Sequence, residues 1–283
     1  MFNPIIVSLD GSAYAEEILP YAQRIAASSG AALTLMRVVD RAEDVDPARE
    51  YLTGVSKRIR TNVNLSVLQG DVAGRIVAEI KAQPDSLAAM TTHGRTGLRG
   101  VLVGGVALNV VKGAGRPVLV YRPVGHLPDG AEISNIVVSL DGSAFSESIL
   151  PAAIQLAKDL KVKMTLLQVL QPMGREATRV SPSRSGDELA QLVDTGAGNP
   201  DVLESSYLHG HAHDIRTQHN VDVEWEVLHG DPGDSICSYV AGRRDVILAI
   251  SAHARPAVER AIFGSVTAAC VRSAGVPILV YWQ

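Results

Sequence analysis

The chain has 283 residues, of which 46% are hydrophobic and 20% are charged, and this suits two globular domains that each bury an apolar core. The formal net charge of −4 argues against an extended nucleic-acid-binding surface and is compatible with a local phosphate site. The sequence shows no apolar stretch long enough to span a bilayer and no basic N-terminal region followed by a long apolar core. We therefore expect a cytoplasmic protein that binds neither membranes nor nucleic acids.

Short apolar runs alternate with longer amphipathic segments along the first half of the chain. We predict the following strands and helices: strands Ile5–Leu9, Ala32–Val38, Leu65–Leu68, Leu87–Thr91 and Val118–Tyr121, and helices Tyr14–Ser28, Ala48–Thr61, Ala73–Ala82 and Ala107–Lys112. The interior proline of the first helix, Pro20, recurs as Pro151 in the second half and predicts a kink. Strands that are apolar throughout are typical of a parallel sheet covered on both faces. The alternation predicts an α/β fold, an open sheet with right-handed crossovers that binds ligands at the carboxyl ends of its strands.

The second half of the chain repeats the first. Residues 8–20, SLDGSAYAEEILP, match residues 139–151, SLDGSAFSESILP, at ten of thirteen positions, an offset of 131. The fifth strands, in residues 117–121 and 277–281, match at an offset of 160, so the second copy carries 29 extra residues. With two long copies rather than many short ones, the chain is a duplicated domain and not a solenoid.

The repeat predicts two tandem domains. We place the first at residues 1–123 and the second at 134–283, joined by a linker at 124–133 that contains proline and glycine. The extra residues of the second copy lie mostly in 171–200, whose composition is typical of a loop insertion. A duplicated gene inherits the ancestral two-fold interface. We therefore expect the domains to pack as a pseudo-dimer through their fifth strands, whose open edges need a partner.

Neither the cysteines nor the clustered histidines form a recognisable metal motif. Cys237 and Cys270 have no partners at metal-binding spacing, and we interpret them as buried apolar residues rather than a disulfide or a redox pair. His209 and His213 share a helical face with His211 between them, but no third ligand is fixed by spacing. A solvated helix face is the favoured interpretation, and we assign no metal site.

The segment that carries chemistry is the loop after the fourth strand together with the start of the next helix. Its candidate phosphate-binding residues are Thr91, His93, Gly94, Arg95, Gly104, Gly105 and Val106 in the first copy, and Ser251, His253, Gly264, Ser265 and Val266 in the second. Glycines let the backbone approach an anion, and a helix start presents unpaired N–H groups at the positive end of the helix dipole. The Walker motif GxxxxGK[ST] does not occur in the sequence. We interpret the histidines as loop hydrogen-bonding residues and assign no catalytic residue.

An aspartate ends the first strand of each copy. Asp10 precedes Gly11-Ser12 and Asp141 precedes Gly142-Ser143. At this edge of a parallel sheet, a carboxylate can accept hydrogen bonds from a ribose or a base edge. In the simpler alternative, the serines cap the first helices and the aspartates accept hydrogen bonds from turn amides.

These motifs together resemble the universal stress protein family in its tandem two-domain form. The family motif is G-x2-G-x9-G-[ST] after the fourth strand, with an aspartate after the first, and the segment THGRTGLRGVLVGG is its most specific match here. The resemblance covers essentially the whole chain and implies a five-stranded, mostly parallel Rossmann-like sheet in each domain, with helices on both faces. In ATP-binding members, the aspartate and a valine at the end of the second strand hold the adenosine. By position, this implies Asp10 and Val38 in the first copy and Asp141 and Val169 in the second, with ATP, alone or with Mg²⁺, as ligand.

Neither copy keeps the family motif intact. The first has Thr91 for the first glycine and Gly105 for the serine or threonine. The second has Ser251 and Ala254 for the first two glycines but keeps Gly264-Ser265. A hydroxyl at the first position can crowd a nucleotide or bond to it, and both alternatives stay open. Losses of this kind lower affinity by about tenfold each and do not prove an empty site.

Two classes of function follow. In the first, the chain is a cytoplasmic stress-associated regulatory protein that binds ATP or a related adenine nucleotide, with slow ATP turnover at most. In the second, it is a nucleotide-free dimerising interaction module; in either case further homo-oligomerisation and an unidentified protein partner stay open. We expect the first copy to bind nucleotide more tightly, because Gly94 and Gly97 keep its loop free whereas Ala254 and Pro256 stiffen the other. The hydroxyl of Ser265 argues the other way.

Overall fold

The computed structural model describes residues 1–92, 104–123, 132–171, 200–253 and 263–283. The first half of the chain contains β1 (Ile5–Ser8), α1 (Ala13–Glu16), α2 (Leu19–Ser29), β2 (Leu33–Val39), a 3₁₀ turn η1 (Ala42–Asp44), α3 (Val45–Ser56), β3 (Val63–Gln69), α4 (Val72–Ala82), β4 (Leu87–Thr91), α5 (Gly105–Gly113) and β5 (Val118–Tyr121). The second half contains β6 (Asn135–Leu140), α6 (Ala144–Glu147), α7 (Leu150–Leu160), β7 (Lys163–Leu170), α9 (Pro200–His219), β8 (Val223–His229), α10 (Pro232–Val240), β9 (Val246–Ala252), α11 (Ser265–Ser273) and β10 (Ile278–Trp282).

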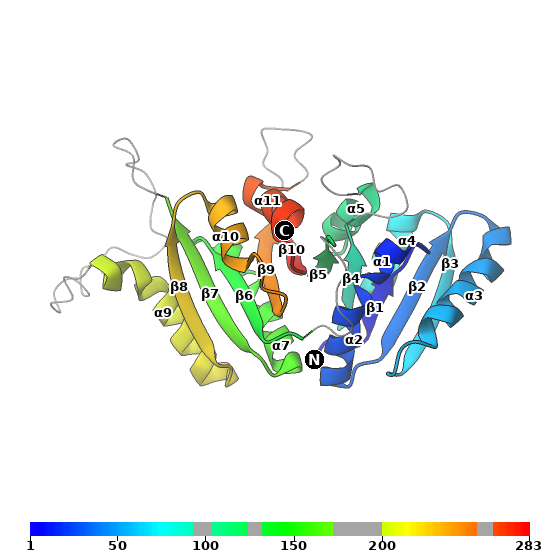
Figure 1. Cartoon of the computed structure of the whole chain (residues 1–283), viewed down its shortest axis with the longest axis horizontal. Helices are drawn as coiled ribbons and strands as arrows, with labels where there is room; N and C mark the ends of the chain where they lie inside the picture. Colours follow the sequence, from blue (N-terminus) through cyan, green and yellow to red (C-terminus); the bar gives the residue numbers. More distant parts are fainter. Residues whose placement is uncertain (93–103, 124–131, 172–199, 254–262) are drawn as a thin grey trace.

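All ten of these strands form one sheet, in the order β3-β2-β1-β4-β5-β10-β9-β6-β7-β8 (Figure 1). Every pairing within a half is parallel, as the alternating pattern predicts. The two halves meet at β5 and β10, which pair antiparallel with Leu119 opposite Leu279. Counted outward from the seam, the strand order is β5-β4-β1-β2-β3 in the first half and the equivalent β10-β9-β6-β7-β8 in the second. The halves therefore form the expected pseudo-dimer through their fifth strands.

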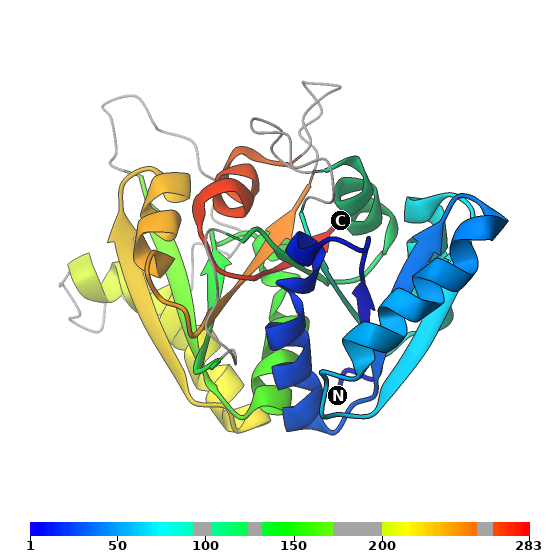
Figure 2. The same ribbon diagram turned by 45° about the vertical axis from the view of Figure 1, so that its right-hand side comes forward.

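Helices cover both faces of the continuous sheet (Figures 1 and 2). One buried cluster packs the sheet against α2, α3, α7 and α9, through residues such as Ile25, Leu52, Ile154 and Leu208. The other packs it against α4, α5, α10 and α11, through residues such as Ile76, Val110, Ile236 and Cys270. Each cluster contains residues of both halves, so the core is shared across the seam.

The halves also touch away from the sheet, where α2 packs beside α7 (Figure 1). The backbone N–H of Phe2 donates a 2.8 Å hydrogen bond to Oδ2 of Asp159, a buried carboxylate on α7. The hydroxyl of Ser28 donates to the carbonyl of Leu160 at 3.3 Å. These contacts extend the pseudo-dimer interface beyond the strand seam.

The first helix of each copy differs from its prediction. Instead of a kinked helix over Tyr14–Ser28, α1 ends at Glu16 and α2 begins at Leu19, so that Pro20 lies in the first turn of a new helix. Pro151 occupies the same place in α7. A proline in the first turn removes an N–H that has no intrahelical partner, so the chain breaks here at little cost.

Other boundaries shift for similar local reasons. β3 runs over Val63–Gln69 rather than Leu65–Leu68: it is an edge strand, and it includes the exposed polar residues Asn64 and Gln69 that the apolar pattern leaves out. α3 covers Val45–Ser56 rather than Ala48–Thr61. The linker and the 171–200 insertion fall almost entirely outside the described residues. In the parts of the chain that the structure describes, no helix has the length and apolar character needed to cross a membrane.

Candidate functional site

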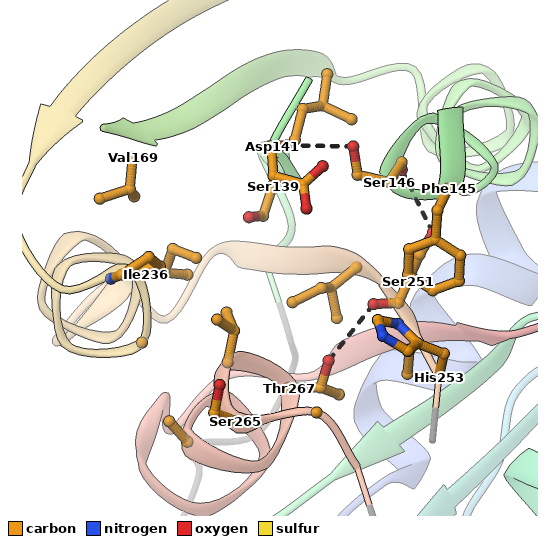
Figure 3. Close-up of a pocket in the computed structure, with 18 of the residues that line it drawn as sticks. Ser139, Asp141, Phe145, Ser146, Val169, Ile236, Ser251, His253, Ser265 and Thr267 are labelled. Carbon is orange, nitrogen blue, oxygen red and sulfur yellow. Dashed lines mark hydrogen bonds between the residues drawn. The ribbon is translucent and has the colours of Figure 1, made fainter. Parts of the chain in front are cut away.

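A cavity of about 350 Å³ opens at the carboxyl ends of β6, β7 and β9 in the second half (Figure 3). Its volume lies in the range of small-molecule sites. Asp141 and Ser139 lie on one side of it, Ser265 and Thr267 of α11 lie opposite, and Val169 and Ile236 of α10 close a third side (Figure 3). A parallel α/β sheet places its ligand sites at this edge, as the sequence predicts.

The structure brings all seven candidate residues of the second copy to this one cavity. They come from four separate segments of the chain and are Asp141, Val169, Ser251, His253, Gly264, Ser265 and Val266. The segments meet because β6, β7 and β9 are adjacent parallel strands and α11 begins beside their ends.

The described candidates of the first copy occupy matching places at the ends of β1, β2 and β4. Asp10 accepts hydrogen bonds from the N–H and hydroxyl of Ser12, at 2.9 and 2.6 Å. Val38 is partly buried against the core, Thr91 is buried at the end of β4, and the N–H of Gly104 donates to the carbonyl of Thr92 at 2.7 Å. Gly105 and Val106 are exposed at the start of α5. His93, Gly94 and Arg95 lie outside the described residues.

A tight turn positions Asp141 at the mouth of the cavity. Gly142 has a φ of 84°, a left-handed conformation that favours glycine, and this turns the chain from β6 into α6. Oδ1 of Asp141 then accepts hydrogen bonds from the N–H and hydroxyl of Ser143, at 2.9 and 2.5 Å. The Ser143 hydroxyl also accepts the N–H of Ser146 at 3.1 Å, which caps α6. The capping interpretation and the binding interpretation of this motif are therefore compatible.

These hydrogen bonds keep Asp141 ionised. Burial alone would raise the pKa of its carboxyl, but hydrogen bonds from the side chain and N–H of Ser143, and from Ser146, outweigh it and lower the pKa below its ordinary value of 3.8. The cavity therefore presents a carboxylate, which is a strong acceptor for hydroxyl and amino groups of a ligand.

The stability that comes from this carboxylate depends on pH with a defined sign. Because folding lowers the Asp141 pKa, the contribution is complete above 3.8 and is lost as the pH falls through the folded-state value. Ser143→Ala is expected to lower the free energy of unfolding by about 0.5–2 kcal/mol at neutral pH, and by less at about pH 3. Denaturant titrations at the two pH values measure this.

The matched control for this experiment is Asp141→Asn, whose side chain does not titrate. In the Asp141→Asn background, Ser143→Ala is expected to cost the same at both pH values. An equal cost at both pH values in the parent protein would show that the ionised state of Asp141 contributes nothing to the turn.

Ser251, which stands in place of the first motif glycine, is engaged within the protein. It is buried, and its hydroxyl lies 2.9 Å from the Ser148 hydroxyl and donates to the carbonyl of Ser146 at 3.3 Å. Its own carbonyl accepts a 3.4 Å hydrogen bond from the hydroxyl of Thr267 (Figure 3). The Ser251 side chain therefore ties β9 to the segment after β6, and its carbonyl ties β9 to α11, at the inner end of the cavity.

The N-termini of α10 and α11, on either side of the cavity, differ in whether a side chain caps their first N–H groups. α10 is capped by Asp231, whose Oδ1 accepts the N–H of Asp234 at 3.1 Å, and it begins with Pro232. α11 begins after Gly264, which provides no side-chain cap, and Ser265 at its first position is exposed. The first N–H groups of α11, at the positive end of its dipole, are thus the ones suited to an anion.

Several cavity residues carry no motif that the sequence alone makes visible. Phe145 stacks edge-on against His253, with ring centroids 4.5 Å apart, and Ile236 supplies an apolar wall from α10. Asp231 belongs to the repeated Gly-Asp turn after the third strand of each copy, and that repetition is a signal that points to it. Ser146 and Thr267 have no counterpart hydroxyls in the first copy and could not be found by comparing the copies.

The histidines of α9 lie away from this cavity. His209 and His213 are exposed, and His209 stacks edge-on against Trp225. Nε2 of His211 lies 3.2 Å from Oε1 of Glu147. In the described portion of the chain, no three or more histidine, cysteine, aspartate or glutamate residues gather closely enough to hold a metal ion.

Comparison with known proteins shows which family the chain belongs to. The family model for the universal stress protein family matches residues 48–122 and 132–281. A curated universal stress protein of Methanocaldococcus jannaschii is 28% identical over 141 residues, covering 43% of this chain and 83% of the relative.

Solved structures extend the likeness to the whole tandem arrangement. A universal stress protein from Archaeoglobus fulgidus superposes with a TM-score of 0.67 at 18% identity, covering 99% of this chain and 98% of that one. A functionally unknown protein from Pseudomonas aeruginosa superposes with a TM-score of 0.66 at 13% identity, covering 100% and 93%. Because the family model matches more than half of the chain, and the repeated α/β fold agrees with it, this chain belongs to the universal stress protein family as a tandem member.

Proposed function

We propose that the cavity of the second half binds ATP or a related adenine nucleotide, and that the chain is a cytoplasmic, stress-associated regulatory protein. The observation that carries this proposal is that the seven candidate residues predicted for the second copy all line one cavity of about 350 Å³. Ala254, which the family motif also implies, lies outside the described residues. The parallel sheet brings the ends of these strands together, and the cavity between them is lined by an acidic side chain, hydroxyls and a helix start.

The chemistry of the cavity suits the three parts of a nucleotide. Val169 and Ile236 offer apolar surface for the base, and Asp141 offers a charged acceptor for ribose hydroxyls. The uncapped start of α11 at Gly264 and Ser265 offers N–H groups and a hydroxyl for phosphate. These polar groups lie on opposite sides of the cavity (Figure 3), so an elongated ligand with a polar sugar and an anionic end fits better than a compact one.

The test is calorimetric titration of the full chain with ATP, comparing two variants on α11. Ser265→Glu places a carboxylate at the proposed phosphate site and is expected to weaken binding by about tenfold through charge repulsion, roughly 1.4 kcal/mol. A glutamate in the first turn of a helix is favourable for the helix itself, so folding is expected to be unaffected. The matched control, Ser273→Glu, adds the same charge at the exposed far end of α11 and is expected to leave ATP affinity unchanged.

One observation favours a second function, a nucleotide-free interaction module. Ser251 replaces a motif glycine and its hydroxyl is already satisfied by Ser146 and Ser148, so the inner end of the cavity is stable without a ligand. Absence of heat and of retained nucleotide in the parent protein, at protein and ATP concentrations in the millimolar range, would favour this alternative over the first.

A further inference from the structure

Both cysteines of the chain lie on the two helices that wall the cavity. Cys237 is on α10 and Cys270 is on α11, 33 residues apart in the sequence. The helices are in close contact one turn earlier, where a Cβ added at Gly233 would lie 3.1 Å from Cβ of Ala269 and 4.0 Å from Cα of Val266.

The spacing of residues along a helix places the cysteines on the same contacting faces. Cys237 lies four residues after Gly233, and Cys270 lies four residues after Val266, so each cysteine continues the face of its helix that touches the other. α10 and α11 both cross between parallel strands on the same face of the sheet, which makes them run in the same general direction. The two thiols therefore lie on facing sides of the two helices.

The two thiols are unequal in a way that suits oxidation. Cys237 is partly exposed, whereas Cys270 is buried. The interaction of each thiol with the other lowers the pKa of Cys237 and, together with burial, raises the pKa of Cys270. Cys237 is thus the thiol that ionises first and that a small oxidant in solution can reach.

We propose that Cys237 and Cys270 are a redox modification site, at which a hydroperoxide converts the two thiols into a reversible disulfide between α10 and α11. In the first step the Cys237 thiolate attacks one peroxide oxygen, the O–O bond breaks, and hydroxide leaves, giving a sulfenic acid. In the second, the Cys270 sulfur, losing its proton, attacks the sulfenic sulfur and releases the hydroxyl group as water. Overall, two thiols and one hydrogen peroxide give one disulfide and two waters.

The position of this disulfide gives it a structural consequence. Ile236 and Ala269, the neighbours of the two cysteines, line the cavity, so the bond would fasten together two of its walls. The proposal does not depend on what the cavity binds. The sequence interpretation of both cysteines as buried apolar residues is wrong for Cys237, which is partly exposed. The proximity of the two helices is not visible in the sequence, because the cysteines are 33 residues apart.

The first half supplies a natural control for this site. At the offset of 160, Val77 on α4 and Val110 on α5 occupy the positions of Cys237 and Cys270. The same helix pair therefore packs with valines in one half and cysteines in the other. Cys237→Val and Cys270→Val are accordingly expected to fold normally, which circular dichroism and thermal unfolding verify.

The experiment treats the reduced full chain with a small excess of hydrogen peroxide and then counts free thiols after denaturation. We expect both thiols to disappear, a peptide containing both cysteines to be recovered under non-reducing conditions, and dithiothreitol to restore both thiols. The midpoint of thermal unfolding of the oxidised chain is expected to rise by about 5–10 °C, because the bond closes a loop in the unfolded chain. In Cys270→Val, oxidation is expected to stop at a sulfenic acid that dimedone traps on Cys237.

Three results would overturn the proposal. The first is that both thiols persist after peroxide treatment. The second is that Cys237 is oxidised irreversibly while the Cys270 thiol remains countable. The third is that disulfides form between chains rather than within one, visible as a dimer on a non-reducing gel.

Discussion

Replacing Leu119 by alanine is expected to lower the free energy of unfolding by about 2–5 kcal/mol. Leu119 is fully buried in β5 and lies directly opposite Leu279 of β10, at the centre of the ten-stranded sheet. Truncation there removes apolar contacts and leaves a cavity in a core that both halves share. Equilibrium denaturation of the full chain measures the loss.

Two companion variants make this test specific to the seam. Leu65→Ala makes the same substitution on the edge strand β3, where the side chain is 40% exposed, and is expected to cost about 1 kcal/mol or less. Leu279→Ala is expected to match Leu119→Ala, and the double variant to cost less than the sum, because the two side chains share one cavity. An equal loss of unfolding free energy in Leu65→Ala and Leu119→Ala would contradict a continuous core. So would two separate unfolding transitions, if Leu119→Ala shifted the midpoint of only one of them.

The contact between the two halves also shows how much of the fold could be predicted from the sequence. Apolar strands such as Val118–Tyr121 predict a parallel sheet, and duplication predicts that the fifth strands meet, because each would otherwise leave an open edge. The break between α1 and α2 is harder to predict. Pro20 indicates that the helix is interrupted, but a kinked helix and a new helix that begins at the proline have the same sequence pattern. The ends of β3 are missed for a different reason: Asn64 and Gln69 are polar and exposed, whereas a buried strand such as β5 is apolar throughout.

In the candidate site, residues required by local structure could be predicted from the sequence, whereas residues brought together by packing could not. Motif positions such as Asp141 and Gly264 are predictable, because a turn and a helix start each demand particular residues. Ser146 and Thr267 are not, because their importance arises from the packing of the segment after β6 against β9 and α11. Comparing the copies cannot reveal them, since the first copy has Ala15 and Ala107 at these positions.

This difference between the two copies affects which half is expected to bind nucleotide more tightly. The sequence favours the first copy, through glycines that lie outside the described residues, whereas the cavity of the second half adds hydroxyls at Ser146, Thr267 and Ser265 that the first copy lacks. Hydroxyls can bond to a polar ligand directly or through the protein network, and glycines permit close approach of the backbone. The two effects favour opposite halves, and variants in each half separate them.

The aspartates that end the first strands allow that measurement. Asp141→Ala is expected to weaken ATP binding at the second half by roughly ten- to a hundredfold, because it removes a charge-assisted acceptor of about 1.5–3 kcal/mol. Asp10→Ala is expected to do the same at the first half, since Asp10 makes the same turn with Ser12. Titration calorimetry of each variant gives the number of ATP molecules bound per chain and the affinity that remains. Asp214→Ala, at an exposed position on α9, is the matched control and is expected to bind ATP as the parent does.

The pattern of losses assigns the sites. If both halves bind, each single variant retains one site and the double variant retains none. If the first half binds more tightly, as its glycines predict, Asp10→Ala removes the high-affinity phase and leaves the weaker one. An unchanged isotherm for Asp141→Ala, with all binding lost in Asp10→Ala, would show that the second cavity is not a nucleotide site and that Asp141 serves its turn alone. Disulfide formation at Cys237 and Cys270 would still be testable in that case, because it requires the contact between α10 and α11 and not a bound nucleotide.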